Sequence, residues 1–101
     1  MRARNFLFLQ TRPPVSAGPE AFDLALTAAA FDHEVRLVLA DDGVFWLKAG
    51  LPELVTEAVE QIAAERESLA ERGLAEPAGI ALLARGELAR LIAAADVVVT
   101  G

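Results

Sequence analysis

Residues 79–100 show a strand pattern, a helix pattern and a second strand pattern in direct succession. "GIALLA" at 79–84 and "DVVVT" at 96–100 are short apolar runs, and "GELARLIAAA" at 86–95 between them is rich in helix-forming residues. A strand, a helix and a strand in this order make a right-handed crossover between two parallel strands. The stretch therefore predicts an α/β fold in three layers, with a mainly parallel sheet and helices on both faces.

The first forty residues repeat this pattern. "NFLFL" at 5–9 is an unbroken apolar run, and "EVRLVLA" at 34–40 is rich in β-branched residues and ends at the turn signal "DDG". Between them, residues 19–30 form an apolar stripe at helical spacing, with a proline in the first turn. These segments predict two more strands joined by a helix, which gives four strands in all.

The middle of the chain is ambiguous. Residues 52–72 are dominated by Ala, Leu, Glu, Gln and Arg, so local propensity predicts one long helix. Such a helix would make an unusually long connection between two parallel strands.

Size and charge limit the classes of function. A chain of 101 residues is expected to form a single domain over 1–101, and with 54% hydrophobic residues it has more apolar surface than a small domain can hide, so we expect it to self-associate. A net charge of −6 argues against direct binding of nucleic acid or of an anionic membrane. The apolar run near residue 5 is too short for a signal-peptide core or a membrane span, so we expect a soluble, cytoplasmic protein.

Three stretches resemble the DsrE/DsrF-like sulfur-relay family, in its TusC/DsrF-like branch. They are "AFDLALTAAAFDHEVRLVLADDGVFWLKAG" at 21–50, "SLAERGL" at 68–74 and "LARLIAAADVVVTG" at 88–101. The resemblance implies a small α/β domain with a mainly parallel sheet that assembles with copies of itself or with cysteine-bearing DsrE/TusD-like subunits. Its register also makes "AVEQIAAE" at 58–65 a fifth strand, with short helices or turns at 51–57 and 66–72, which is the alternative to the long helix.

The chain contains no cysteine. Sulfur transfer through a persulfide requires a thiolate, which neither serine nor threonine can replace. Together with the resemblance, this predicts a non-catalytic subunit that scaffolds sulfur relay, for tRNA thiolation or sulfur oxidation, without enzymatic activity of its own. The alternative is a stand-alone oligomeric module that binds a small anion or a nucleotide.

The ends of the first two strands supply the candidate ligand site. The loop 11–18 leaves one strand and opens onto a helix, so its polar and glycine residues could surround an anion, and the acid pair "DD" follows the next strand. The possible pocket consists of Arg12, Ser16, Gly18, Asp41 and Asp42. We predict no catalytic residue, no cofactor and no metal site, because two adjacent acids fit a capped turn better than a metal site. A hydrolase would need His33, the only histidine, with Ser16 or Ser68, and is the weakest hypothesis.

Two aromatic residues directly follow the acidic turn. Consecutive residues of a turn or short helix cannot both face one small core, and aromatic residues are enriched in interface centres. We therefore predict a subunit interface at Val44, Phe45, Trp46 and Leu47, anchored by Trp46 or Phe45.

Overall fold

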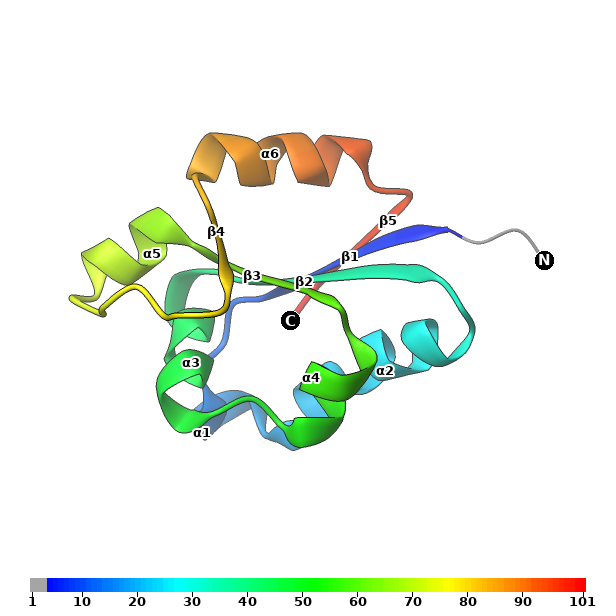
Figure 1. The fold of residues 1–101 in the computed structure, drawn as a ribbon, viewed down its shortest axis with the longest axis horizontal. Coiled ribbons are helices and arrows are strands. Elements are labelled where there is room, and N and C mark those ends of the chain that lie inside the picture. The colour runs from blue at the N-terminus through cyan, green and yellow to red at the C-terminus, as the bar shows by residue number, and fades with distance from the viewer. Residues whose placement is uncertain (1–3) are drawn as a thin grey trace.

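The computed structural model describes residues 4–101, except for the side chain of Pro19, and contains one parallel sheet of five strands (Figure 1). The strands lie in the order β4-β3-β2-β1-β5, and every neighbouring pair is parallel. Their bounds are β1 Asn5–Gln10, β2 Glu34–Leu39, β3 Gln61–Glu65, β4 Ala81–Leu83 and β5 Val97–Thr100. The predicted α/β fold with a parallel sheet is confirmed.

Helices cover both faces of the sheet, but unequally. Of the helices in the described residues, Figure 1 shows α6 alone on one side and α1 to α4 on the other. The helical segments are α1 Pro14–Ala17, η1 Pro19–Phe22, α2 Asp23–Ala30, η2 Asp41–Phe45, α3 Trp46–Ala49, α4 Glu53–Ala58, α5 Arg66–Glu71 and α6 Arg85–Ala94. The connections from β1 to β4 step in one direction across the sheet and only the last one returns, so right-handed crossovers leave α6 alone on its face.

The prediction of one long helix over 52–72 is wrong, and the alternative prediction of a fifth strand near 58–65 is confirmed. The segment divides into α4, β3 and α5, and β3 pairs with β2 on one side and β4 on the other. Ala63 and Ala64 face opposite sides of the sheet and are both buried, Ala63 in the cluster that includes Leu88 of α6 and Ala64 in the larger cluster on the other face. Pairing in the sheet therefore overrides the helical preference of alanine and glutamate.

The main hydrophobic core lies beneath α1 to α4. It contains the aromatic side chains of Phe8, Phe22 and Trp46, packed with aliphatic residues of β2 and of the helices. The rings of Phe22 and Trp46 meet edge to face at 4.8 Å. A smaller core lies under α6 and consists of Leu7, Val38, Ala40, Ala63 and Leu88.

The acidic turn after β2 is held against the end of β1. The amide N–H of Ala40 donates to the carbonyl oxygen of Gln10 at 3.1 Å, and a Cβ on Gly43 would lie only 1.8 Å from that oxygen. Glycine is therefore required at 43 because β1 passes so closely. The turn continues into η2 and α3, which carries Trp46 into the core.

Candidate functional site

The carboxyl ends of the strands are where open parallel sheets bind ligands. In this chain a cluster of buried and charged side chains lies there, at the ends of β3 and β4. Glu65 ends β3 and is 4% exposed, Ser68 follows in α5 and is fully buried, and Arg85 follows β4 at the start of α6. We call Glu65, Ser68 and Arg85 the Glu65 cluster.

Glu65 is the centre of this cluster. Its Oε1 accepts hydrogen bonds from Arg85 Nη2 at 2.9 Å and from the Ser68 hydroxyl. Burial alone would raise the pKa of Glu65, but the hydrogen bonds from Arg85 and Ser68, with the charges of Arg85 and Arg72, lower it overall. Glu65 is therefore held as a carboxylate, which suits it to accept hydrogen bonds and not to donate a proton.

Ser68 links the cluster to the acidic turn. Its Oγ accepts the amide N–H of Asp41 at 2.9 Å, and Asp41 has a positive φ of 50° that this hydrogen bond stabilises. Asp42 accepts a hydrogen bond from Arg72 Nε at 2.9 Å, and Arg72 also donates to the carbonyl oxygen of Ser68. The ends of β2 and β3 are thus joined by hydrogen bonds between the two turns.

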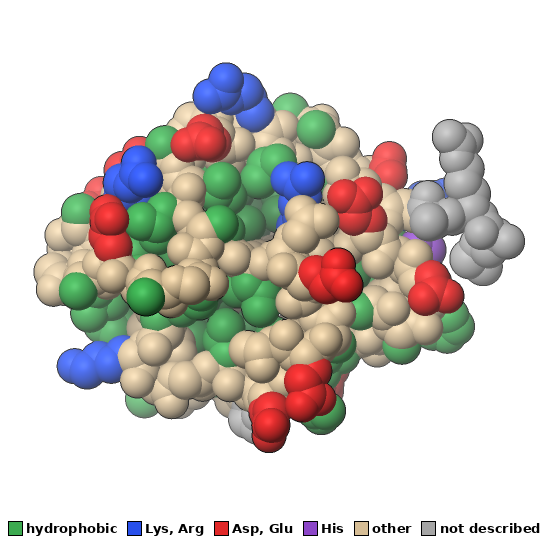
Figure 2. Space-filling model, in the orientation of Figure 1, with side chains coloured by type: hydrophobic (Ala, Val, Ile, Leu, Met, Phe, Trp, Pro, Cys, Tyr) green, Lys and Arg blue, Asp and Glu red, His purple; other side chains and the backbone are tan. Residues whose placement is uncertain are grey.

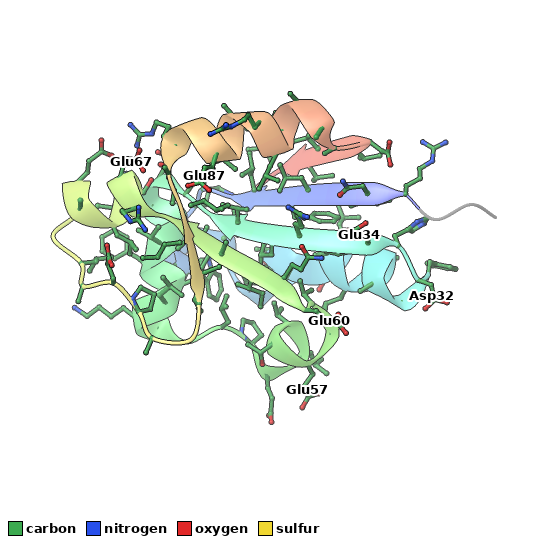
Figure 3. All side chains as sticks on the ribbon, turned by 45° about the horizontal axis from the view of Figure 1, so that its top comes forward. Asp32, Glu34, Glu57, Glu60, Glu67 and Glu87 are labelled. Carbon is green, nitrogen blue, oxygen red and sulfur yellow. The ribbon has the colours of Figure 1, made fainter. Side chains whose placement is uncertain are left out.

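The start of α6 is occupied by acidic side chains of the chain itself. Both carboxylate oxygens of Glu67 accept the amide N–H of Arg85, at 3.0 and 2.9 Å, and Glu87 accepts that of Ala84 at 3.1 Å. Figure 3 shows Glu67 and Glu87 beside this end of the helix. The positive end of α6 is therefore already neutralised from within.

A second feature lies at the carboxyl ends of β1 and β5. Gln10 is 2% exposed, and both polar atoms of its side-chain amide are buried without a hydrogen-bond partner in the described part of the chain. A cavity of about 220 Å³ adjoins it and is lined by Gln10, Arg12, Glu20, Phe22 and Thr100, among others. Of the predicted ligand residues, only Arg12 lines this cavity.

The structure does not gather the predicted ligand residues into one pocket. Ser16 is exposed on α1, where its hydroxyl donates to the carbonyl oxygen of Pro13, and Gly18 joins α1 to η1 with a φ of 70°. Asp41 and Asp42 belong to the network around Ser68. The loop residues and the acid pair therefore form two separate groups.

The hydrolase hypothesis gains no support from these positions. His33 precedes β2 at the amino end of the sheet, where its Nδ1 accepts the amide N–H of Arg4 at 3.0 Å and its ring packs against Phe6. Ser16 and Ser68 both follow the carboxyl ends of strands. The six residues of β2 thus separate His33 from the end of the sheet that carries Ser68.

The predicted interface stretch divides between core and surface. Val44 and Trp46 are buried in the chain's own core, and Trp46 Nε1 donates to the carbonyl oxygen of Arg12 at 3.1 Å. Phe45 and Leu47 are half-buried. Of the two aromatic residues named as anchors, Trp46 is therefore a core residue, Phe45 stays partly exposed, and the subunit contact itself remains a prediction.

Comparison with known proteins addresses the identity of the fold. A family model described as the DsrE/DsrF-like family matches residues 4–100. The chain belongs to the DsrE/DsrF-like family. Among solved structures, the YchN protein from E. coli superposes with a TM-score of 0.74 at 22% sequence identity, covering 97% of this chain and 99% of that one. No curated protein matches the sequence.

Two absences apply to the described part of this DsrE/DsrF-like chain. Within residues 4–101, no three His, Cys, Asp or Glu side chains lie together as a metal site would require. No helix in the same range is long and apolar enough to cross a membrane.

Sequence reasoning missed the Glu65 cluster. It considered Ser68 only as a nucleophile and gave Glu65 and Arg85 no role. The available signal was "AAERES" at 63–68, in which a predicted strand ends in an acid beside arginine and serine. In an open parallel sheet, such a strand end lies at the edge where ligands usually bind.

Proposed function

We propose that this chain is a subunit of a DsrE/DsrF-type sulfur-relay assembly that supports sulfur transfer without carrying the sulfur itself. The observation that carries the proposal is the family match over residues 4–100 in a chain that contains no cysteine. The thiolate must then come from another subunit. A TusC/DsrF-like role, with copies of itself and a cysteine-bearing DsrE/TusD-like protein as partners, fits this requirement.

The Glu65 cluster supports a structural role for the ligand edge of this chain. Glu65 is held as a carboxylate, and Ser68 is fully buried with its hydroxyl donated to Glu65. A hydroxyl in that position is closed to substrates. The cluster thus ties α5 and α6 to the sheet and offers no nucleophile to sulfur.

The contact with the cysteine-bearing subunit is proposed at an apolar groove beside Phe45. This groove has a volume of about 490 Å³ and is lined by Pro13, Pro14, Val15, Asp42, Phe45, Lys48 and Ala49. Val15 is 96% exposed, so its side chain is free to be buried by a partner. Three features suit an interface with an apolar centre and a polar rim: the prolines, the phenylalanine, and the two charged residues at the edge.

A reconstitution tests this proposal. The purified chain is mixed with a cysteine-bearing DsrE/TusD-like protein from the same cells, and complex formation is followed by sedimentation velocity. We expect a complex that Phe45→Ser weakens at least tenfold, because aromatic anchors dominate interface energies. Phe31→Ser is the matched control, since Phe31 is 71% exposed in the turn after α2, away from the groove.

Two results would contradict the proposal. One is sulfane sulfur that remains bound to this chain after gel filtration. The other is a failure to associate with any cysteine-bearing member of the family at tens of micromolar.

The second candidate function is a binding module for a small anion or nucleotide. Arg12 favours it, because this exposed cation lines the 220 Å³ cavity at the carboxyl ends of β1 and β5. Titration with inorganic phosphate and with AMP, on the parent chain and on Arg12→Gln, separates this function from the first. A defined site that depends on Arg12 would favour the binding module.

A further inference from the structure

The sheet face under α6 is only partly covered. Four inter-strand spacings make the five-stranded sheet about 19 Å wide, whereas one helix with its side chains is about 10 Å across. Leu88 of α6 is buried in one cluster with Leu7 of β1, Val38 of β2 and Ala63 of β3. Within residues 4–101, no second helix lies beside α6 over β3 and β4, and Figure 2 shows apolar side chains in a hollow below α6.

This hollow is a groove of about 390 Å³. Its apolar wall comprises Val38, Ala63, Ala81, Leu83 and Leu91, and its polar wall is formed by Arg36, Glu60 and Gln61. The volume falls within the range of small-molecule sites, about 300 to 1,000 Å³. The groove lies on the opposite face of the sheet from Phe45 and Trp46, so it is separate from the proposed subunit contact.

Arg36 is the unusual residue of the groove. It occupies the middle of β2, opposite Leu7 on one neighbouring strand and Gln61 on the other, where the pattern of this face would otherwise place an apolar side chain. The residue is half-buried, and its Nε is buried with no hydrogen-bond partner among residues 4–101. Buried donors are nearly always paired, so this one calls for a partner.

Arg72 is the other half-buried arginine of residues 4–101, and it has an anionic partner, as do the exposed Arg66 and Arg85; the remaining arginines, Arg4, Arg12 and Arg90, are exposed to solvent. Arg66 pairs with Glu76, Arg72 with Asp42, and Arg85 with Glu65 and Glu71. No ion pair joins Arg36 to a carboxylate of residues 4–101. A cation beside an apolar wall, with no ion pair to a carboxylate of the described residues, is complementary to a ligand that supplies both a carboxylate and an apolar body.

We propose that this groove binds an amphipathic monocarboxylate, such as a medium-chain fatty acid. The carboxylate pairs with the guanidinium of Arg36, and the chain lies along Val38, Ala63, Leu83 and Leu91. Glu60 lies at the start of β3 (Figure 3), where it is exposed at one end of the groove and limits the ligand to a single negative charge. The inference does not depend on sulfur relay, because it concerns another face of the sheet.

The test compares four probes on the full chain by titration calorimetry and by amide chemical shifts. Octanoate carries both required features, 1-octanol lacks the charge, octylammonium reverses it, and acetate lacks the chain. We expect octanoate to bind about tenfold tighter than octanol, as a charged hydrogen bond predicts, and acetate to bind immeasurably weakly. The shifts should concentrate in residues 36–38, 61–63 and 81–83.

Two variants with the same change in net charge locate the site. Arg36→Gln should reduce octanoate binding to the level of octanol, whereas Arg90→Gln, on the exposed side of α6, should leave it unchanged. Arg36→Lys keeps the charge and should retain part of the difference. Octanol binding is also measured for each variant. A variant that is misfolded would lose octanol binding as well as octanoate binding.

The proposal is wrong if octanol or octylammonium binds as tightly as octanoate, since the groove would then be merely apolar or would favour cations. It is equally wrong if Arg36→Gln binds octanoate like the parent chain. A third contradiction is a set of groove resonances that shift with protein concentration and not with octanoate, because a second copy of the chain would then occupy the groove.

Discussion

The two faces of the sheet are built from the same strands but packed to different degrees. Within residues 4–101, fourteen residues form the buried cluster beneath α1 to α4, and five form the one beneath α6. The difference follows from topology, because three crossovers lie on one face and a single one on the other. A parallel sheet whose strand order reverses once thus acquires a densely packed face, here called the rigid face, and a partly covered face, here called the open face.

The largest effect is expected on the rigid face. Phe22 is 1% exposed and packs against Trp46, so Phe22→Ala leaves a cavity that the surrounding helices cannot fill. We expect the free energy of unfolding to fall by about 3 to 5 kcal/mol, a large part of the stability of a small domain. Urea denaturation monitored by circular dichroism measures this loss.

A smaller effect is expected on the open face. Leu88 is 6% exposed and is the buried residue of α6 in the smaller cluster. Leu88→Ala should cost about 2 to 3 kcal/mol, at the lower end for buried leucines, because the neighbouring groove lets side chains and water adjust. If Leu88→Ala proves as costly as Phe22→Ala, the two faces are equally rigid and the comparison fails.

Most of this architecture could be predicted from the sequence. Apolar runs alternating with helical stretches predicted strands near 5–9, 34–40, 79–84 and 96–100, and all four are present with shifts of one or two residues at their ends. Such patterns report which residues are buried, and burial is what a parallel sheet imposes on its strands. The unequal covering of the faces could not be predicted, because it depends on the order of the strands.

The fifth strand and the site needed more than local pattern. β3 is composed of residues that favour helices, so only the family resemblance predicted it. The contacts of Ser68 with Asp41, and of Arg85 with Glu65, join residues 27 and 20 positions apart. Nothing in their spacing reveals these partners, since the fold brings them together only at the ends of neighbouring strands.

A smaller loss of stability is expected at the Glu65 cluster, where β3 ends beside the start of α6. Glu65→Gln removes the charge that pairs with Arg85, although Arg85 keeps Glu71, so we expect a loss of about 1 to 2 kcal/mol at neutral pH. Glu71→Gln is the control. Glu71 is exposed, so its pairs should contribute well under 1 kcal/mol.

The stabilisation that Glu65 provides should also depend on pH. The pKa of Glu65 in the folded chain lies below its ordinary value of 4.5, so the unfolded chain takes up this proton first as the pH falls. The contribution of Glu65 to stability is therefore complete near neutral pH and is lost as the pH falls below the ordinary pKa of 4.5. The difference in unfolding free energy between the parent chain and Glu65→Gln should shrink accordingly, and a difference that grows on acidification would contradict the assigned charge.

The smallest effect is expected at Gln10, the last residue of β1, and it should be a gain in stability. Gln10 is 2% exposed, and both polar atoms of its amide are buried without partners among residues 4–101. Such burial costs stability, because water binds these atoms in the unfolded chain. Gln10→Met keeps the unbranched shape and removes the two polar atoms, so the free energy of unfolding should rise by about 1 kcal/mol. Gln61→Met is the matched control, because Gln61 is exposed at the start of β3 and its replacement should change stability by less than about 0.5 kcal/mol. A loss of stability in Gln10→Met would show that the amide has a partner in solution, such as an ordered water in the adjoining cavity. Water would then reach the core at this end of the rigid face.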